Sequence, residues 1–214
     1  MLVVAAFVLA VSGLIMTPYG HYLPPDFDYG FLRQKESFFY SSGYFVGFYA
    51  HLVAAPTAIL IGTAQLSRTL RQQTPALHEK LGTAYSLLVL GGAAPGGAIM
   101  ALRANGGWSS VICFLLLSGL TWWVTWVGWQ KARQFKYREH GRWMLRSYVL
   151  LSSAIILRCV YISLKHWNLD PTLTYQIAVW ASWVPAIVIL EAGFRWRFTH
   201  TRKPTDATAR KVVP

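Results

Sequence analysis

Residues 108–129 read WSSVICFLLLSGLTWWVTWVGW and contain no charged side chain. A helix needs about 20 mostly apolar residues to cross the hydrocarbon core of a bilayer, and this stretch is long enough. Backbone groups in lipid must be hydrogen-bonded within the protein, and transmembrane barrel strands are shorter and alternate polar with apolar residues. The stretch therefore predicts a transmembrane helix.

The composition of the 214-residue chain supports the same class of protein. Only 13% of the residues are charged, whereas soluble domains carry about 25%. Hydrophobic residues make up 54%, which excludes a disordered chain, and two cysteines are too few for a disulfide scaffold. We therefore expect an all-α integral membrane protein.

Similar apolar runs recur along the chain and predict about six transmembrane helices. They would form one membrane domain, residues 1–198, followed by a disordered basic tail, residues 199–214. The expected spans are residues 2–16, 43–66, 81–102, 108–129, 143–164 and 174–194. The first span is short and has no basic residues before it, so we expect an uncleaved anchor, with a signal peptide as the alternative.

The net charge of +12 is mainly an orientation signal. Of the 20 Lys and Arg residues, 15 lie in residues 67–80, in residues 130–146 and in the tail from residue 195, which are alternate segments between spans. The positive-inside rule places these segments in the cytoplasm. We expect a bacterial inner-membrane protein with both termini cytoplasmic and residues 17–42 as an outward loop, with a short helix on the interface. The orientation in the membrane accounts for the basic residues of these loops, so we expect no nucleic-acid partner.

Two histidines stand at the cytoplasmic ends of the expected spans 81–102 and 143–164. His78 precedes the first of these spans and His140 precedes the second, at an offset of 62 residues. Each span is the second helix of a hairpin with a basic cytoplasmic loop. This arrangement would follow from a duplicated hairpin, although unrelated hairpins can look alike. If the repeat is real, spans two to five form a four-helix bundle.

Two ionisable side chains lie inside the expected spans, where they are costly and therefore suggest a function. His51 and Arg158 are each roughly 9–12 Å from the outer end of their span, at 1.5 Å per residue. Arg158 either binds an anion, such as a propionate, or extends to the outer interface. Glu191 lies near the cytoplasmic face, and we expect it to pair with Arg195 one turn away.

Small residues interrupt the middle of span 81–102. The glycines of Gly91-Gly92 and Pro95-Gly96-Gly97 have no side chain that would keep a neighbouring group at a distance. Either another helix packs closely there or a flat ligand occupies the space. Gly43 and Gly47 add a weak GxxxG signal in span 43–66.

A b-type haem is the cofactor that the histidines fit best. Two axial imidazoles must come from facing helices at the same depth. His78 and His140 meet that condition at the cytoplasmic side, whereas His51 has no histidine at its own depth. One bis-histidine site, or a site with a single histidine, can be assembled, and Arg158 would then bind a propionate.

A copper site is the weaker alternative. It would combine His51 with Cys113, Cys159 and Met100, because sulfur and nitrogen ligands suit copper. No close spacing supports it, and a buried cysteine is commonly just small and apolar. The motifs of zinc proteases, phosphate-binding loops and dinucleotide-binding folds are absent from the chain.

Several short motifs resemble one family of bacterial membrane proteins. They are His51, Gly62-Thr63-Ala64-Gln65-Leu66, His78 with Gly82, His140 with Trp143-Met144-Leu145-Arg146-Ser147, and Arg158. Over about residues 44–165 the chain resembles the uncharacterised family named domain of unknown function 2306. The family's usual basic residue after the first loop histidine is Glu79 here, with Lys80 next. The resemblance implies a multi-helix membrane protein of unassigned function.

Three functions remain open from the sequence. The first is a haem-binding or quinone-linked redox membrane protein, with His51, His78 and His140 as ligand candidates and Arg158 as an anion anchor. The second is a small-molecule or lipid carrier that uses Arg158 and His51 to bind an anionic headgroup. The third is a non-catalytic subunit of a membrane complex. The sequence does not decide whether the protein is an enzyme.

Overall fold

The part of the chain that the computed structural model describes is helical and contains no strand. It comprises residues 6, 10, 13, 17–41, 43–167 and 169–200. The expected first span, 2–16, and the expected tail, 199–214, lie mainly outside these residues.

Five helices in the described residues are long and apolar enough to cross a membrane, which confirms the second to sixth expected spans. The elements are η1 (Thr17–His21), η2 (Gly30–Gln34), α2 (Glu36–Phe39), α3 (Tyr44–Gln65), α4 (Arg68–Gln73), α5 (Pro75–Leu88), η3 (Val89–Ala93), α6 (Ala94–Ala101), α7 (Gly107–Arg133), α8 (Tyr137–Leu151), α9 (Ser153–Lys165), α10 (Pro171–Ala181) and α11 (Val184–His200). A π-helical turn, η3, joins α5 to α6 without a break.

Two of these helices begin earlier than their apolar stretches predict. α5 begins at Pro75 and α8 at Tyr137, rather than near residues 81 and 143. Proline suits the first turn of a helix because its missing N–H would be unpaired there anyway. The prediction that His78 and His140 precede their helices is therefore wrong: both lie in the first helical turn.

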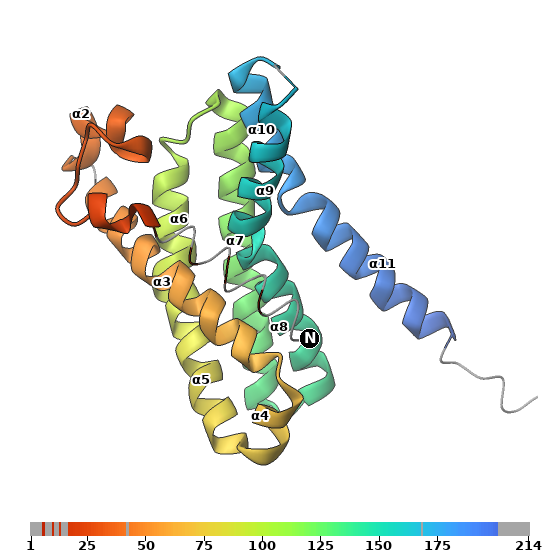
Figure 1. Ribbon diagram of the computed structural model, residues 1–214. Coiled ribbons are helices and arrows are strands. Elements are labelled where there is room, and N and C mark those ends of the chain that lie inside the picture. The colour runs from red at the N-terminus through yellow and green to blue at the C-terminus, as the bar shows by residue number, and fades with distance from the viewer. Residues whose placement is uncertain are drawn as a thin grey trace, which may run out of the picture.

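The four helices α3, α5–η3–α6, α7 and α8 pack as a bundle, as expected for spans two to five (Figure 1). We call one end the basic end; it carries α4, residues 134–136 and the starts of α5 and α8. The opposite end carries residues 17–41 and residues 102–106. α10 packs against α7 and α9, whereas α11 contacts α8 and α10 and leans away from the bundle. α5 and α8 thus run in the same direction from the basic end.

Glycines let α3 and α6 approach closely. A Cβ on Gly96 would lie 2.5 Å from the carbonyl oxygen of Gly47 and 2.8 Å from the amide nitrogen of His51. A Cβ on Gly92 would lie 2.6 Å from the Cβ of Ala54. The small residues of this span therefore serve helix packing, and α3 occupies the space that a flat ligand would need.

We predict that Gly96→Ala destabilises the bundle by about 1–3 kcal/mol, because the added methyl group must push α3 outward. Gly91→Ala is the matched control, since a Cβ at Gly91 meets nothing within 4 Å. Thermal unfolding in detergent, followed by tryptophan fluorescence, measures both variants. Equal midpoints for the two variants would contradict the close contact.

Residues 17–41 form a folded segment, which we call the N-terminal cap, where the sequence predicted a loop with one short helix. Its three short helices, η1, η2 and α2, lie beside the start of α3 (Figure 1). Tyr22, Leu32 and Phe39 of the cap are buried in one cluster with Tyr44 of α3. Aromatic packing against α3, which hydropathy does not register, orders this segment.

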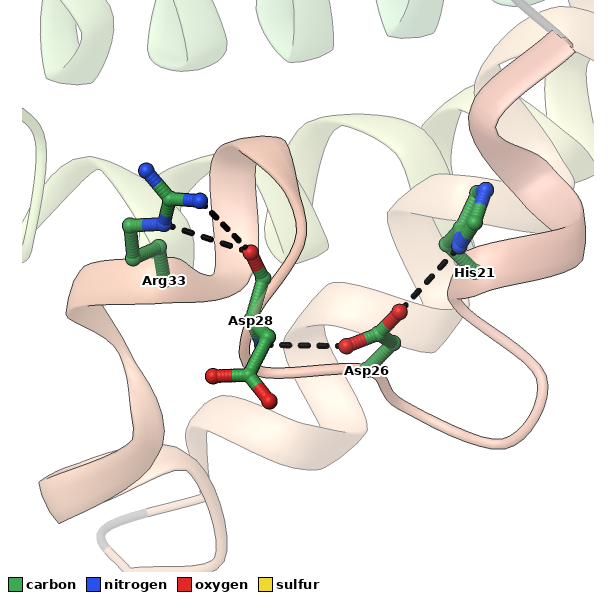
Figure 2. Close-up of polar contacts among 4 residues, drawn as sticks. All are labelled: His21, Asp26, Asp28 and Arg33. Carbon is green, nitrogen blue, oxygen red and sulfur yellow. Dashed lines mark hydrogen bonds and ion pairs between the residues drawn. The ribbon is translucent and has the colours of Figure 1, made fainter.

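Polar contacts on the exposed side of the cap hold the turn between η1 and η2 (Figure 2). The Asp26 carboxylate accepts a hydrogen bond from the backbone N–H of Asp28 at 3.0 Å and lies 3.2 Å from Nδ1 of His21. The Arg33 guanidinium donates to the Asp28 carbonyl at 2.9 and 3.2 Å. These bonds stay within the cap and do not reach the bundle.

Lys35 anchors the cap to the bundle. Its side chain is buried, at 2% exposure, and its Nζ donates to the carbonyl of Arg103 at 2.5 Å and to Oδ1 of Asn105 at 3.1 Å. Nζ also lies 5.4 Å from the centre of the Phe31 ring and 5.7 Å from that of Phe38. Burial, and to a smaller extent the nearby Arg103, lower the pKa of Lys35. These contacts offset the cost of burying the ammonium group.

We predict that Lys35→Met loosens the cap, because the Arg103 carbonyl and the Asn105 side chain lose their donor at a cost of about 1–3 kcal/mol. Limited proteolysis within the cap should then be roughly tenfold faster. Arg33→Met is the control, since Arg33 is exposed and its guanidinium donates hydrogen bonds to the Asp28 carbonyl within the cap. Equal cleavage of the two variants would show that Lys35 is not the anchor.

Candidate functional site

The four site residues predicted from the sequence lie at two levels of the bundle. His78 and His140 are at the basic end, whereas His51 and Arg158 lie in the opposite half. Along α8 and α9, the path from His140 to Arg158 spans roughly 27 Å at 1.5 Å per residue. Arg158 therefore cannot contact a group bound between His78 and His140.

His140 is held in one orientation by α7. Its Nδ1 lies 2.8 Å from the carbonyl oxygen of Gly128. Because a carbonyl can only accept, Nδ1 carries the proton, and the lone pair of Nε2 is left for another partner. A backbone carbonyl on the second ring nitrogen is the usual support of a metal-ligating histidine.

His78 has an imidazole nitrogen that lacks a partner. Its Nδ1 is buried and makes no hydrogen bond among the described residues, and the same holds for Oε1 of Gln65. Gln65 lies over the first turn of α5, where its Nε2 donates to the His78 carbonyl at 2.7 Å. Buried polar atoms nearly always have a partner, so these two atoms offer bonding positions to a ligand, an ion or a water molecule.

His78 and His140 lie at a similar level of the bundle, each two helical turns from a contact between α5 and α8. The Tyr85 hydroxyl of α5 lies 2.8 Å from Oγ of Ser147 of α8. Each histidine precedes its contact residue by seven positions, which is two helical turns on the same face. The register of this contact therefore puts the two predicted histidines at one level of the bundle.

A chain of buried hydroxyls closes the bundle interior beyond the histidines. Oγ1 of Thr125 donates to the Thr121 carbonyl at 2.6 Å, so it accepts from Oγ of Ser147, also at 2.6 Å. Oγ of Ser147 then accepts a hydrogen bond from the Tyr85 hydroxyl, so the hydroxyl groups of Thr125, Ser147 and Tyr85 all have partners. Tyr85 and Ser147 each lie seven positions after a histidine, and this shared spacing is the sequence signal that could have found them.

His51 is accounted for by packing in the opposite half. Its Nδ1 donates to the Ala93 carbonyl at 2.7 Å, and the same atom lies 3.2 Å from the position of a Cβ on Gly97. Cys113 is buried and accepts a hydrogen bond from Nε1 of Trp183, whereas Cys159 is exposed. No three His, Cys, Asp or Glu residues in the described part of the chain could hold a metal ion together. The copper alternative finds no support in this geometry.

Arg158 has no acidic partner in the described residues, because none of the ion pairs found there includes it. Its side chain is exposed, and its Nη1 donates to the Ala154 carbonyl of its own helix at 3.0 Å. The guanidinium lies close enough to act electrostatically on His51, as the similar depths predicted, and on tyrosines of the cap. Burial raises the pKa of Tyr19 and Tyr22, and the charge of Arg158 opposes this rise.

The expected pairing of Glu191 with Arg195 is wrong. The Glu191 carboxylate accepts two hydrogen bonds from Arg146 of α8, at 2.5 Å from Nε and 2.9 Å from Nη2. Arg195 acts on Glu191 only as a weaker, additional charge. Spacing along one helix suggested Arg195, but α11 packs on α8, which presents a bidentate partner.

The comparisons with known proteins agree with this architecture. Residues 48–192 match the family described as predicted membrane protein (DUF2306), and this range includes all four candidate site residues. No curated protein matches the chain, and no solved structure matches it. The match covers more than half of the chain, from α3 into α11. The chain therefore belongs to the DUF2306 family of predicted membrane proteins.

Proposed function

We propose that this protein is a redox membrane protein that holds a haem b between His78 and His140. The observation that supports the proposal is that two histidines, from separate helical hairpins, lie at one level of the bundle. Two axial imidazoles on facing helices are what a b-type haem requires in a membrane bundle.

The residues at the basic end fit such a group. Nδ1 of His140 is bound to the Gly128 carbonyl and its Nε2 is available, and Nδ1 of His78 is buried with no partner among the residues that the structure describes. Arg71 of α4 acts electrostatically on His78, so a cation is at hand for a propionate at this end. Arg71 thus replaces Arg158 in the role that the sequence suggested.

A bound haem would supply one-electron transfer, and the chain supplies its surroundings. The two histidines would hold the group, and the hydroxyl chain from Tyr85 to Thr125 would close the interior beyond it. By the positive-inside rule, the basic residues at this end support a site on the cytoplasmic side, with both termini cytoplasmic in a bacterial inner membrane. The haem would then exchange electrons with a quinone or another redox partner.

The test is the visible spectrum of the protein purified from haem-sufficient cells, in oxidised and reduced form. We expect a Soret band and a reduced α-band at about one haem per chain. His78→Ala and His140→Ala should each lose most of the signal, and added imidazole should restore part of it.

His166→Ala is the matched control for the spectrum. His166 is exposed, and its Nδ1 lies 3.0 Å from the Ile162 carbonyl of its own helix, so its loss should leave the bands unchanged. His51→Ala should also retain them. If the wild-type protein lacks the bands, or if both His78→Ala and His140→Ala keep them, the proposal fails.

A further inference from the structure

A cavity of about 300 Å³ lies between α11 and the bundle, and the proposed haem site does not use it. Its walls come from α7, α8 and α11, on the side where α11 leans away from the bundle (Figure 1). We call it the α11 cavity. Its volume is at the lower end of the range of small-molecule sites. One end is polar and holds Arg146 and Glu191, whereas the other end is apolar and is lined by Leu120, Leu150 and Ile187.

The polar end of the α11 cavity lies on the side of the basic end of the bundle. Leu150 follows Arg146 by four residues on α8, which runs away from the basic end, so Leu150 lies about one helical turn deeper. Ile187 precedes Glu191 by four residues on α11, which runs back toward that end (Figure 1). The cavity therefore suits an amphiphile whose polar group faces the basic end and whose apolar chain extends inward.

Arg146 and Glu191 form a neutral pair that can make further hydrogen bonds. The Glu191 carboxylate accepts from Nε of Arg146 at 2.5 Å and from Nη2 at 2.9 Å. These bonds use two of the five N–H donors of the guanidinium, and each carboxylate oxygen can accept a further bond. Because the two charges compensate each other, the pair favours a neutral ligand with hydrogen-bonding oxygens over an anion, which would meet the carboxylate.

Two indole rings line the α11 cavity beside this pair. The ring centres of Trp123 of α7 and Trp143 of α8 are 5.3 Å apart, and the ring planes meet at 78°. Cζ of Arg146 lies 4.7 Å from the centre of the Trp143 ring and 4.9 Å from that of Phe194, which holds the guanidinium between α8 and α11. Aromatic rings prefer stacked or edge-to-face neighbours. The two indoles therefore offer contacts of both kinds to a flat ring.

We propose that the α11 cavity binds the ring of a membrane quinone, with the apolar tail toward Leu120, Leu150 and Ile187. A quinone is neutral, its carbonyl oxygens accept hydrogen bonds from the Arg146 guanidinium, and the hydroxyl groups of its reduced form donate to the Glu191 carboxylate.

The inference deepens the proposed function and rests on it only for the role of the bound quinone. Arg146 follows His140 by six residues on α8, which is roughly 9 Å along the helix axis. A quinone in the α11 cavity would therefore lie near a haem held by His140 and would be its redox partner. Binding of the quinone itself does not require the haem.

Thermal unfolding of the full-length protein in detergent, followed by circular dichroism, tests the binding. The probe is decylubiquinone, and decylbenzene is compared with it because it keeps a ring and the tail but lacks the ring oxygens. Phosphatidylglycerol is the third probe and represents an anionic headgroup. We expect decylubiquinone to raise the unfolding temperature in a saturable way and the other two to raise it less. An equal effect of decylbenzene would show an unspecific apolar groove, and a larger effect of phosphatidylglycerol would show a lipid site; either result overturns the proposal.

Variants on one face of α7 assign the effect to the cavity. Leu120→Trp places an indole in the space for the ring and tail, so it should weaken the apparent affinity for decylubiquinone by about tenfold or more. Leu116→Trp is the matched control, since Leu116 is an exposed leucine one turn earlier on α7 and does not line the cavity. It should bind as the wild type does. Equal affinities of the two variants would overturn the proposal.

The role of the ion pair is tested by the double variant Arg146→Gln with Glu191→Gln. The two amides can still bond to each other, and the loss of both charges should weaken the affinity by roughly tenfold. Unchanged affinity would show that the pair does not recognise the ring oxygens. If the double variant does not fold, the comparison of Leu120→Trp with Leu116→Trp decides the proposal by itself.

Measurements on His140→Ala separate this proposal from that of the haem. The variant should lack the haem bands and bind decylubiquinone as the wild type does. Absent haem bands with retained binding contradict only the proposed function, whereas haem bands without binding contradict only the quinone site. The visible spectrum of Leu120→Trp should match that of the wild type.

Discussion

The hydrogen bond between Tyr85 and Ser147 sets the level at which the two helical hairpins meet. It is buried and joins two helices that run in the same direction, so slipping either one along its axis would leave a hydroxyl unpaired inside the bundle. The same register brings His78 and His140 to one height. The geometry of the proposed haem site therefore follows from a contact between side chains that would never touch a ligand.

The two ends of the bundle differ in the number of their charged residues and in how these are paired. The basic end gathers many cations, and there Arg146 is paired with Glu191 while His78 retains an unpaired nitrogen. The other end carries few charges, and there Lys35 is satisfied by a carbonyl, an amide and two rings, whereas Arg158 forms no ion pair with any acid of the described residues. The unpaired groups at each end are the places where a ligand improves the balance most.

Much of the fold was predictable because the bilayer imposes a length on every apolar helix. The helix starts at Pro75 and Tyr137 were missed, since hydropathy measures apolar character and not hydrogen bonding. The N-terminal cap was read as a loop because its order comes from aromatic contacts with α3. The partner of Glu191 was misassigned for the same reason, since helix spacing records neighbours within one helix and not those across the bundle.

The sequence by itself determined the class of protein, the five spans found in the described residues, and the four ionisable residues that are candidates for a site. These properties depend on the composition of each helix by itself and need no contact with another helix. Only the tertiary structure decided that the four residues lie at two levels, that the bond between Tyr85 and Ser147 sets His78 and His140 at one height, and that Arg146 is the partner of Glu191. Such contacts join segments distant in the chain, and their energies depend on packing that no local pattern encodes.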